Sequence, residues 1–151
     1  MPKITPFLWF DNNAEEAVEF YLGVFPNSRR VNELRAGDAG PGPKGSVITM
    51  AFELDGRPFT ALNGGPMHKF NEAVSFVVHC KDQKEIDHYW TRLGDGGSEI
   101  ACGWLKDRFG LCWQIIPEKI AELLRHPEAM RAMMTMKKLD IAALEAAAKR
   151  G

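Results

Sequence analysis

Two segments of the chain pair a short apolar run with a helical pattern. The first run, ITPFLWF at residues 4–10, is rich in aromatic and β-branched residues, which is typical of a strand. After this run in the sequence, apolar residues recur at helical spacing until Pro26, which ends the predicted helix. Asn13 occupies the expected N-cap position, and Glu16 three residues later completes the pattern of a capping box.

The same pattern returns in the second half of the chain. The run AVSFVVHC at residues 73–80 predicts a strand, and Asp82 and Glu85 supply the cap and the acid of a second helix. Cap, acid and apolar stripe all lie 69 positions after their first counterparts, which indicates an internal repeat. The matched pairs are Asn13 and Asp82, Glu16 and Glu85, Ala17 and Ile86, Phe20 and Tyr89, Tyr21 and Trp90, and Val24 and Leu93.

After each predicted helix the apolar period changes from that of a helix to that of a strand. Tight turns are predicted at residues 55–56 and 107–110. Each half therefore has the order β-α-β-β-β. The strands predicted after the two helices in the sequence are residues 29–35, 47–53, 58–62, 98–101, 103–106 and 111–116.

The part of the sequence after residue 117 has a helical pattern. Helices are predicted at residues 119–124 and 127–136, and a last helix at 142–149 is capped by Asp140. Four methionines between residues 130 and 136 cannot share one helix face. We expect them to cover a core or a subunit contact, with a Met-lined ligand site as the alternative.

A four-stranded half with a single helix leaves one face of its sheet bare. We therefore expect an α+β fold in which two paired βαβββ modules form a curved eight-stranded cup, followed by C-terminal helices. The length suits one compact domain over residues 1–151. Its predicted parts are a first module at 3–63, a second module at 70–117 and a helical extension at 118–150.

The charge balance argues against several classes of function. Nineteen Lys and Arg against twenty Asp and Glu leave a formal charge of -1, without the basic surplus of nucleic-acid-binding proteins. No run approaches the roughly 20 apolar residues of a membrane span, and residues 1–11 lack a signal-peptide pattern. We expect a soluble, cytoplasmic protein that binds neither nucleic acid nor membranes.

The cysteines and histidines form no recognisable motif. Cys80, Cys102 and Cys112 lack zinc-type spacing, which favours free thiols in a reducing compartment. Lys106 is the only nearby base in sequence for Cys102 or Cys112, so thiol catalysis is the lesser alternative. His68 and His79 are candidates for a metal pair or an acid–base role, but surface or structural roles account for them.

Lys106, Asp107 and Arg108 lie together at a predicted hairpin tip. We expect a solvated turn there, with an anion grip as the alternative.

Four phrases of the sequence resemble one known family. They are PFLWFDNNAEEAVEFYLGVFPNSR, NGGP followed by FNEAVSFVV, DQKEIDHYW, and CGWLKDRFGLCWQIIP. In this order they resemble the PhnB-like family, whose members often carry the name 3-demethylubiquinone-9 3-methyltransferase. That family belongs to the vicinal oxygen chelate superfamily of glyoxalase, bleomycin-resistance and dioxygenase proteins. The resemblance runs from about Lys3 to the C-terminus and implies paired βαβββ units that form an open cup.

In metal-using members of that superfamily, four strand positions each point a His, Glu or Gln ligand into the cup. The resemblance places these positions near Thr5 or Pro6, near Asn63, near Ser75 and at Gln114. Only Gln114 is a ligand type that the pattern uses, so we expect no tightly bound catalytic metal and no other cofactor. A Gly-rich turn from strand to helix, as a methyl-donor site uses, is also missing from the sequence.

The sequence thus predicts a binding cup without a catalytic constellation. Its amides, hydroxyl and aromatic walls would suit an uncharged or weakly polar ring compound, unless the polar groups bond only to one another. The candidate ligand-binding residues are Trp9, Asn63, Ser75, Cys102, Trp104 and Gln114.

We expect a metal-free protein that binds a small organic molecule. We also expect a homodimer, because open cups leave apolar edges. One alternative is an enzyme, either the methyltransferase of the family name or a metal-dependent lyase or dioxygenase. The other is a subunit or scaffold module whose cup is filled by its own side chains.

Overall fold

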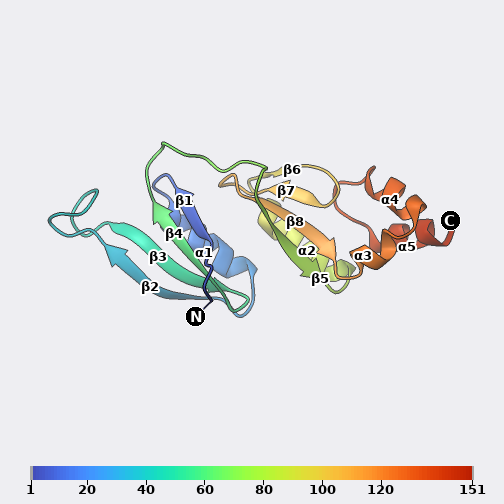
Figure 1. Ribbon diagram of the computed structural model, residues 1–151, viewed down its shortest axis with the longest axis horizontal. Coiled ribbons are helices and arrows are strands. Elements are labelled where there is room, and N and C mark those ends of the chain that lie inside the picture. The colour runs from blue at the N-terminus through green and yellow to red at the C-terminus, as the bar shows by residue number, and fades with distance from the viewer. Residues whose placement is uncertain (1, 151) are drawn as a thin grey trace. The chain divides into compact units, whose positions relative to one another are not determined.

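The computed structural model describes residues 2–150, which divide into two compact units, one ending at Lys69 and the other beginning at Phe70. Each unit contains one four-stranded sheet with a helix packed against it (Figure 1). The order β-α-β-β-β occurs in both units, so the predicted α+β fold with a repeated module is confirmed. Within residues 2–150, every helix is too short or too polar to span a bilayer.

The first unit is built around a sheet with the strand order β1-β4-β3-β2. Strand β1 runs parallel to β4, and the other two pairs are antiparallel. In chain order the elements are β1 (Phe7–Phe10), α1 (Ala14–Val24), β2 (Arg29–Arg35), β3 (Val47–Leu54) and β4 (Arg57–Asn63).

Alternation along these strands gives the first sheet one buried face and one open face. Helix α1 packs on the buried face through Ala17 and Tyr21, neither of which is exposed. The rings of Phe52 and Phe59 stack there at 5.5 Å between centroids. Each large side chain buried in this way contributes about 1.5–3 kcal/mol.

The second unit repeats this arrangement with the strand order β5-β8-β7-β6. Its elements are β5 (Ser75–Cys80), α2 (Gln83–Gly94), β6 (Ser98–Glu99), β7 (Trp104–Lys106) and β8 (Cys112–Pro117). Helix α2 packs against β7 and β8 through the predicted apolar stripe, all of which is buried: Ile86, Tyr89, Trp90 and Leu93.

Three helices complete the second unit: α3 (Ile120–Leu123), α4 (Pro127–Met133) and α5 (Ile141–Arg150). They close over a small core of Ile116, Leu139 and Leu144, against which Met133 and Met136 pack. Met130 and Met134 are exposed instead, so the methionines do lie on different faces. The predicted cap of the last helix is confirmed, because the Ala143 N–H donates to Asp140 Oδ1 at 3.0 Å.

The two sheet-covering helices begin differently, although the sequence predicts the same cap for both. At α2, Asp82 accepts a hydrogen bond from the Glu85 N–H, and Glu85 in turn accepts one from the Lys81 N–H. At α1, the Asn13 side chain makes no capping bond within residues 2–150, so the predicted capping box is wrong there. The first turn of α1 is instead capped by the side chain of Asn63, the last residue of β4.

Several predicted element ends also differ. The strand expected at residues 98–101 ends at Glu99, since a turn with left-handed backbone at Cys102 (φ 56°) and Gly103 (φ 85°) interrupts it. The helices expected at 119–124 and 127–136 are shorter, spanning Ile120–Leu123 and Pro127–Met133.

Candidate functional site

The face of the second sheet that points away from α2 carries three of the predicted site residues. Trp104 and Gln114 share this open face because Leu105, Trp113 and Ile115, their neighbours in the strands, are buried on the α2 side, and the parallel register of β5 with β8 puts Ser75 on the same face. Trp104 lies directly opposite Gln114 on the paired strands, and Ser75 lies opposite Cys112, one diagonal step from Gln114. The structure therefore brings these three residues together.

A hydrogen bond orients the polar pair on this face. Gln114 Nε2 donates to Ser75 Oγ at 2.9 Å. Within residues 2–150, neither the amide oxygen of Gln114 nor the indole N–H of Trp104 has another partner. A serine hydroxyl that accepts a bond still carries its own proton, and the Gln114 NH₂ group has a second N–H. With the Trp104 indole the face therefore offers three donors, and the Gln114 amide oxygen is an acceptor, all uncharged.

An ion pair lies at one end of this open face. Lys106 Nζ donates to Glu72 Oε1, and both side chains are partly exposed. The hydrogen bond from Lys106 lowers the pKa of Glu72, and the same bond raises the pKa of Lys106. The two charges therefore compensate each other at neutral pH.

The thiol of Cys112 lies opposite Lys106 on the same strands and is fully buried. Burial raises its pKa, and Glu72 and Asp107 act in the same direction against the lowering effect of Lys106. Because the thiolate is the nucleophilic form, the structure gives no support to thiol catalysis at this residue.

Cys102, another of the predicted site residues, lies outside β7, which begins at Trp104. The turn at Cys102 breaks the strand, and its backbone N–H donates to the Met136 carbonyl at 2.8 Å. The next amide, that of Gly103, donates to the Lys137 carbonyl at 2.8 Å. This segment therefore attaches the C-terminal extension to the sheet, and Cys102 is not part of the strand that carries Trp104.

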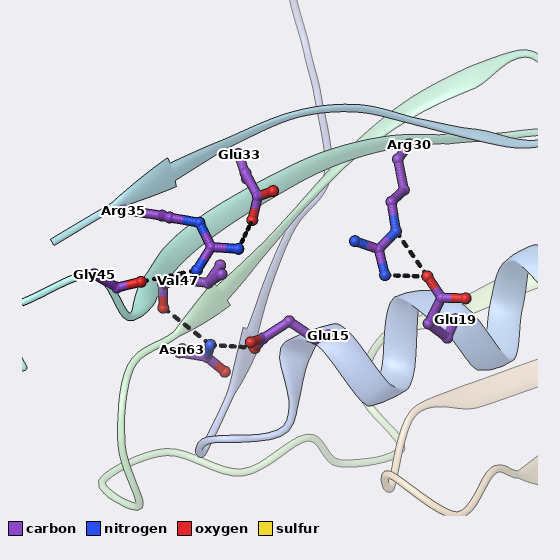
Figure 2. Close-up of polar contacts among 8 residues, drawn as sticks. All are labelled: Glu15, Glu19, Arg30, Glu33, Arg35, Gly45, Val47 and Asn63. Carbon is purple, nitrogen blue, oxygen red and sulfur yellow. Dashed lines mark hydrogen bonds and ion pairs between the residues drawn. The ribbon is translucent and has the colours of Figure 1, made fainter. Parts of the chain in front are cut away.

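Asn63 lies on the helix side of the first sheet. Its neighbour in β4, Leu62, faces the other way and lies on the open face. Figure 2 shows the Asn63 amide between the start of β3 and the first turn of α1: Nδ2 donates to the Val47 carbonyl at 3.0 Å and to Glu15 Oε1 at 2.8 Å. The Ala14 N–H donates to Asn63 Oδ1 at 2.9 Å. The amide thus takes over the capping that Asn13 does not provide.

Trp9 lies on the open face of the first sheet, opposite Leu62. Its indole N–H donates to the Gly65 carbonyl at 2.9 Å, and the His68 ring meets it edge-on at 4.7 Å between centroids. A Cβ at Gly64 would lie 2.4 Å from the indole, so only glycine fits there. The segment that follows β4 in the chain therefore holds the indole in place, and the contact of His68 with Trp9 is part of it.

Asp107 is a residue whose role the sequence analysis missed. It is only 2% exposed, and its carboxylate accepts hydrogen bonds from the Phe109 and Leu111 N–H groups and from the Trp113 indole. The expected solvated turn is therefore wrong for this residue. Its flanking charges bond elsewhere, Lys106 to Glu72 and Arg108 to Asp95, so the three residues form no common anion grip.

Comparisons with known proteins agree with this architecture. The family model described as 3-demethylubiquinone-9 3-methyltransferase matches residues 2–116. The PhnB protein from Bacillus cereus has 34% sequence identity over 77% of this chain and 99% of its own, with a TM-score of 0.70. Protein PA1353 from Pseudomonas aeruginosa has 22% identity over 78% of this chain and 98% of its own, with a TM-score of 0.64.

More distant structures share the fold alone. The fosfomycin resistance protein FosX from Listeria monocytogenes, in complex with Mn(II) and sulfate, has 12% identity over 83% of this chain and 98% of its own, with a TM-score of 0.55. No curated protein sequence matches the chain.

The repeated βαβββ modules and these structural matches define the fold that the chain shares with the PhnB protein and with FosX. The chain belongs to the PhnB-like family, the one described as 3-demethylubiquinone-9 3-methyltransferase. The resemblance found in the sequence is confirmed.

Proposed function

We propose that the chain binds a small organic molecule, an uncharged or weakly polar ring compound, on the open face of the second sheet. The observation that carries this proposal is the bonded pair of Gln114 and Ser75 beside Trp104. The indole supplies a flat apolar surface for a ring, while the amide oxygen and the uncharged donors fix the orientation of one polar substituent. Neutral groups favour a neutral ligand, since the charges of Lys106 and Glu72 at the end of this face are already paired with each other.

For the first unit taken by itself, we propose the indole of Trp9 as an aromatic surface on which a ring can stack. Its ring is held rigidly by Gly65 and His68, so little entropy would be lost on binding. We leave Asn63 and Cys102 out of the proposed contacts. The Asn63 amide is occupied by three bonds to α1 and β3, and Cys102 lies in the turn beside Met136.

We further propose that binding needs no metal ion. The distant relative FosX holds Mn(II). At the two positions of the second module where the family resemblance places metal ligands, this chain has a serine hydroxyl and an amide whose NH₂ group points at that hydroxyl. A divalent cation here would find one amide oxygen and one hydroxyl but no carboxylate and no imidazole, so this donor set does not fit one. Elemental analysis after dialysis tests this, and about one Zn, Ni, Mn or Fe per chain would contradict it.

The family description names a methyl transfer, and we propose binding instead. The segments that lead from β1 to α1 and from β5 to α2, residues 11–13 and 81–82, contain no glycine. A typical methyl-donor or dinucleotide site needs a Gly-rich turn at that place. Heat of binding on adding S-adenosylmethionine would favour the transferase.

The experiment that tests the ligand proposal is a thermal-shift and calorimetric screen. The probes are neutral quinones and aromatic antibiotics, with benzoate and benzylamine as charged counterparts. We expect stabilisation by neutral rings alone, since a ligand stabilises the state that it binds. Trp104→Ala and Gln114→Leu should abolish the shift, and His88→Ala, exposed on α2, should keep it. A panel without any shift would favour a module filled by its own side chains.

We also propose that the chain forms a homodimer. Phe7 and Leu34 are each 58% exposed and Val77 is 42% exposed, all three on strands. Apolar side chains at such positions are typical of association surfaces. Light scattering at micromolar concentration should give twice the chain mass of 16.9 kDa, and a monomer would contradict the proposal.

A cytoplasmic location is proposed as well. The three cysteines are all free thiols in the structure, which suits a reducing compartment. Fractionation of the native host would test this.

A further inference from the structure

A cavity of about 340 Å³ lies in the second unit, where the sheet meets the C-terminal extension. The ends of β5 and β8 form one wall through Cys80 and Pro117. One face of α5 forms another through Ile141, Glu145 and Ala148, which follow one another at helical spacing. This volume lies at the lower end of the range of ligand sites, about 300–1,000 Å³.

The inner part of the cavity is apolar. Cys80 is 1% exposed, and burial, ahead of the nearby acidic groups, raises the pKa of its thiol to about 12. Because the thiol stays protonated, it acts here as a small apolar group beside Pro117, Leu123, Ile141 and Ala148.

The rim of the cavity carries both signs of charge. Lys81 and Lys119 provide cations, Glu118, Glu122 and Glu145 provide carboxylates, and His126 completes the rim. All six side chains are exposed, and within residues 2–150 none of them forms an ion pair with another side chain. Their charges are therefore available to a ligand.

The rim carboxylates do not form a metal site. Within the described part of the chain, no three His, Cys, Asp or Glu side chains come together in a way that could hold an ion. A ligand that satisfies this cavity must instead present both charges to the rim and an apolar body to the interior.

We propose that this cavity binds a small zwitterion with an apolar side chain, of the chemical class of aliphatic and aromatic amino acids. Its carboxylate would meet Lys81 and Lys119, and its ammonium group would meet the Glu residues of the rim. All lining residues except Cys80 and Lys81 lie beyond residue 116, where the family match ends. The site is therefore a feature of the extension and is separate from the open sheet face around Gln114.

The proposal can be tested by NMR titration of the full chain. The probes are L-phenylalanine and two analogues that each lack one charge, 3-phenylpropionate and phenethylamine. We expect L-phenylalanine to shift the amide signals of residues 118–126 and 141–148, and to bind roughly tenfold more tightly than either analogue. Equal affinity for the three probes, or no shifts at millimolar concentration, would overturn the proposal.

Matched variants localise the effect. Ala148→Trp fills the cavity and should abolish the shifts, whereas Ala146→Trp, exposed on the same helix, should leave them unchanged. Lys119→Gln and Glu122→Gln, both at the surface, should each weaken binding roughly tenfold, with exposed Lys149→Gln as the control. If neither charge variant weakens binding, or if Ala148→Trp folds and still binds normally, the assignment is wrong.

Discussion

The indole N–H of Trp113 donates a 2.9 Å hydrogen bond to Oδ2 of Asp107, six residues earlier in the same hairpin. The other oxygen of this carboxylate accepts the Phe109 and Leu111 N–H groups. One buried charge thus fixes both the turn and the helix-facing ring of β8. Because Gln114 follows Trp113 directly, the same contact sets where the proposed site residue points.

Replacing Asp107 by alanine should therefore be strongly destabilising. Three buried or partly buried donors would lose their acceptor, and we expect a loss of about 2–4 kcal/mol in the free energy of unfolding, measured with urea. Asp95→Ala is the control: this carboxylate is 74% exposed in its pair with Arg108 and should cost less than about 1 kcal/mol. A similar loss for both variants would contradict the role given to Asp107.

Asn63→Asp tests whether this side chain caps α1. The carboxylate could still accept from Ala14, but it would face the Glu15 carboxylate and the Val47 carbonyl without a donor for either. We expect a loss of about 2 kcal/mol at pH 7. The repulsion raises the folded pKa of the new acid, so most of the loss should disappear as the pH falls below its unfolded pKa of about 3.9; the one bond that a single O–H cannot replace stays lost. Asn12→Asp, at an exposed position in the segment before α1, should show neither effect.

The accessible thiol should be that of Cys102. It is partly exposed, whereas Cys80 and Cys112 are 1% and 0% exposed, and burial raises the pKa of both buried thiols. With a disulfide reagent at pH 8, one thiol per native chain should react rapidly, and Cys102→Ser should remove that reaction. All three should react in denaturant. Rapid labelling of Cys112 in the native protein would contradict the burial seen here.

The fold was predictable because its signals are local and repeated. The capping residues, apolar stripes and period changes each depend on neighbouring residues, and the second copy of the pattern supports the first. The side-chain roles of Asn63 and Asp107 were not predictable in this way. Asn63 bonds to residues 49 and 48 positions away, and Asp107 bonds to an indole that alternation places on the helix side of the sheet.

The site was predictable only in part, for the same reason. Ser75 and Gln114 lie on strands whose alternation is regular, so their common face followed from the sequence. Cys102 lies in a turn with left-handed backbone, where alternation ends. The cavity beside α5 depends on how the extension packs, which no short motif encodes.

The ion pair of Lys106 and Glu72 should give stability a defined pH dependence. The bond from Lys106 lowers the pKa of Glu72 below its ordinary value of 4.5. The stabilisation that ionised Glu72 gives to the fold is therefore present above pH 4.5 and is lost as the pH falls through the lowered pKa. The raised pKa of Lys106 means that its contribution is present below 10.5 and is lost as the pH rises through the raised value. Glu72→Gln should reduce urea stability slightly at pH 7 but not at acidic pH, and high salt should remove the difference. If the stability difference caused by Glu72→Gln depended on neither pH nor salt, the Glu72 side chain would stabilise the fold through packing and not through its charge.

Gln83, the first residue of α2, should control how firmly the C-terminal helix is attached. Its Nε2 donates to the Leu139 carbonyl at 2.9 Å and to Asp87 Oδ1 at 3.0 Å, and its Oε1 accepts the Ile141 N–H at 2.8 Å. Gln83→Ala removes all three bonds, so we expect local opening of α5 to become easier by about 1–3 kcal/mol.

Hydrogen exchange measures that opening directly. Amides of residues 139–150 should exchange roughly tenfold to a hundredfold faster in Gln83→Ala, while those of β8 keep their rates. The pKa of Asp87 should rise towards its ordinary value of 3.8, because the Gln83 bond is the largest cause of its lowering and the Lys138 contacts alone would remain. Lys84→Ala, exposed one residue further along α2, should leave both quantities unchanged. Unchanged exchange in α5 would show that the core of Ile116, Leu139 and Leu144 holds the helix without the glutamine.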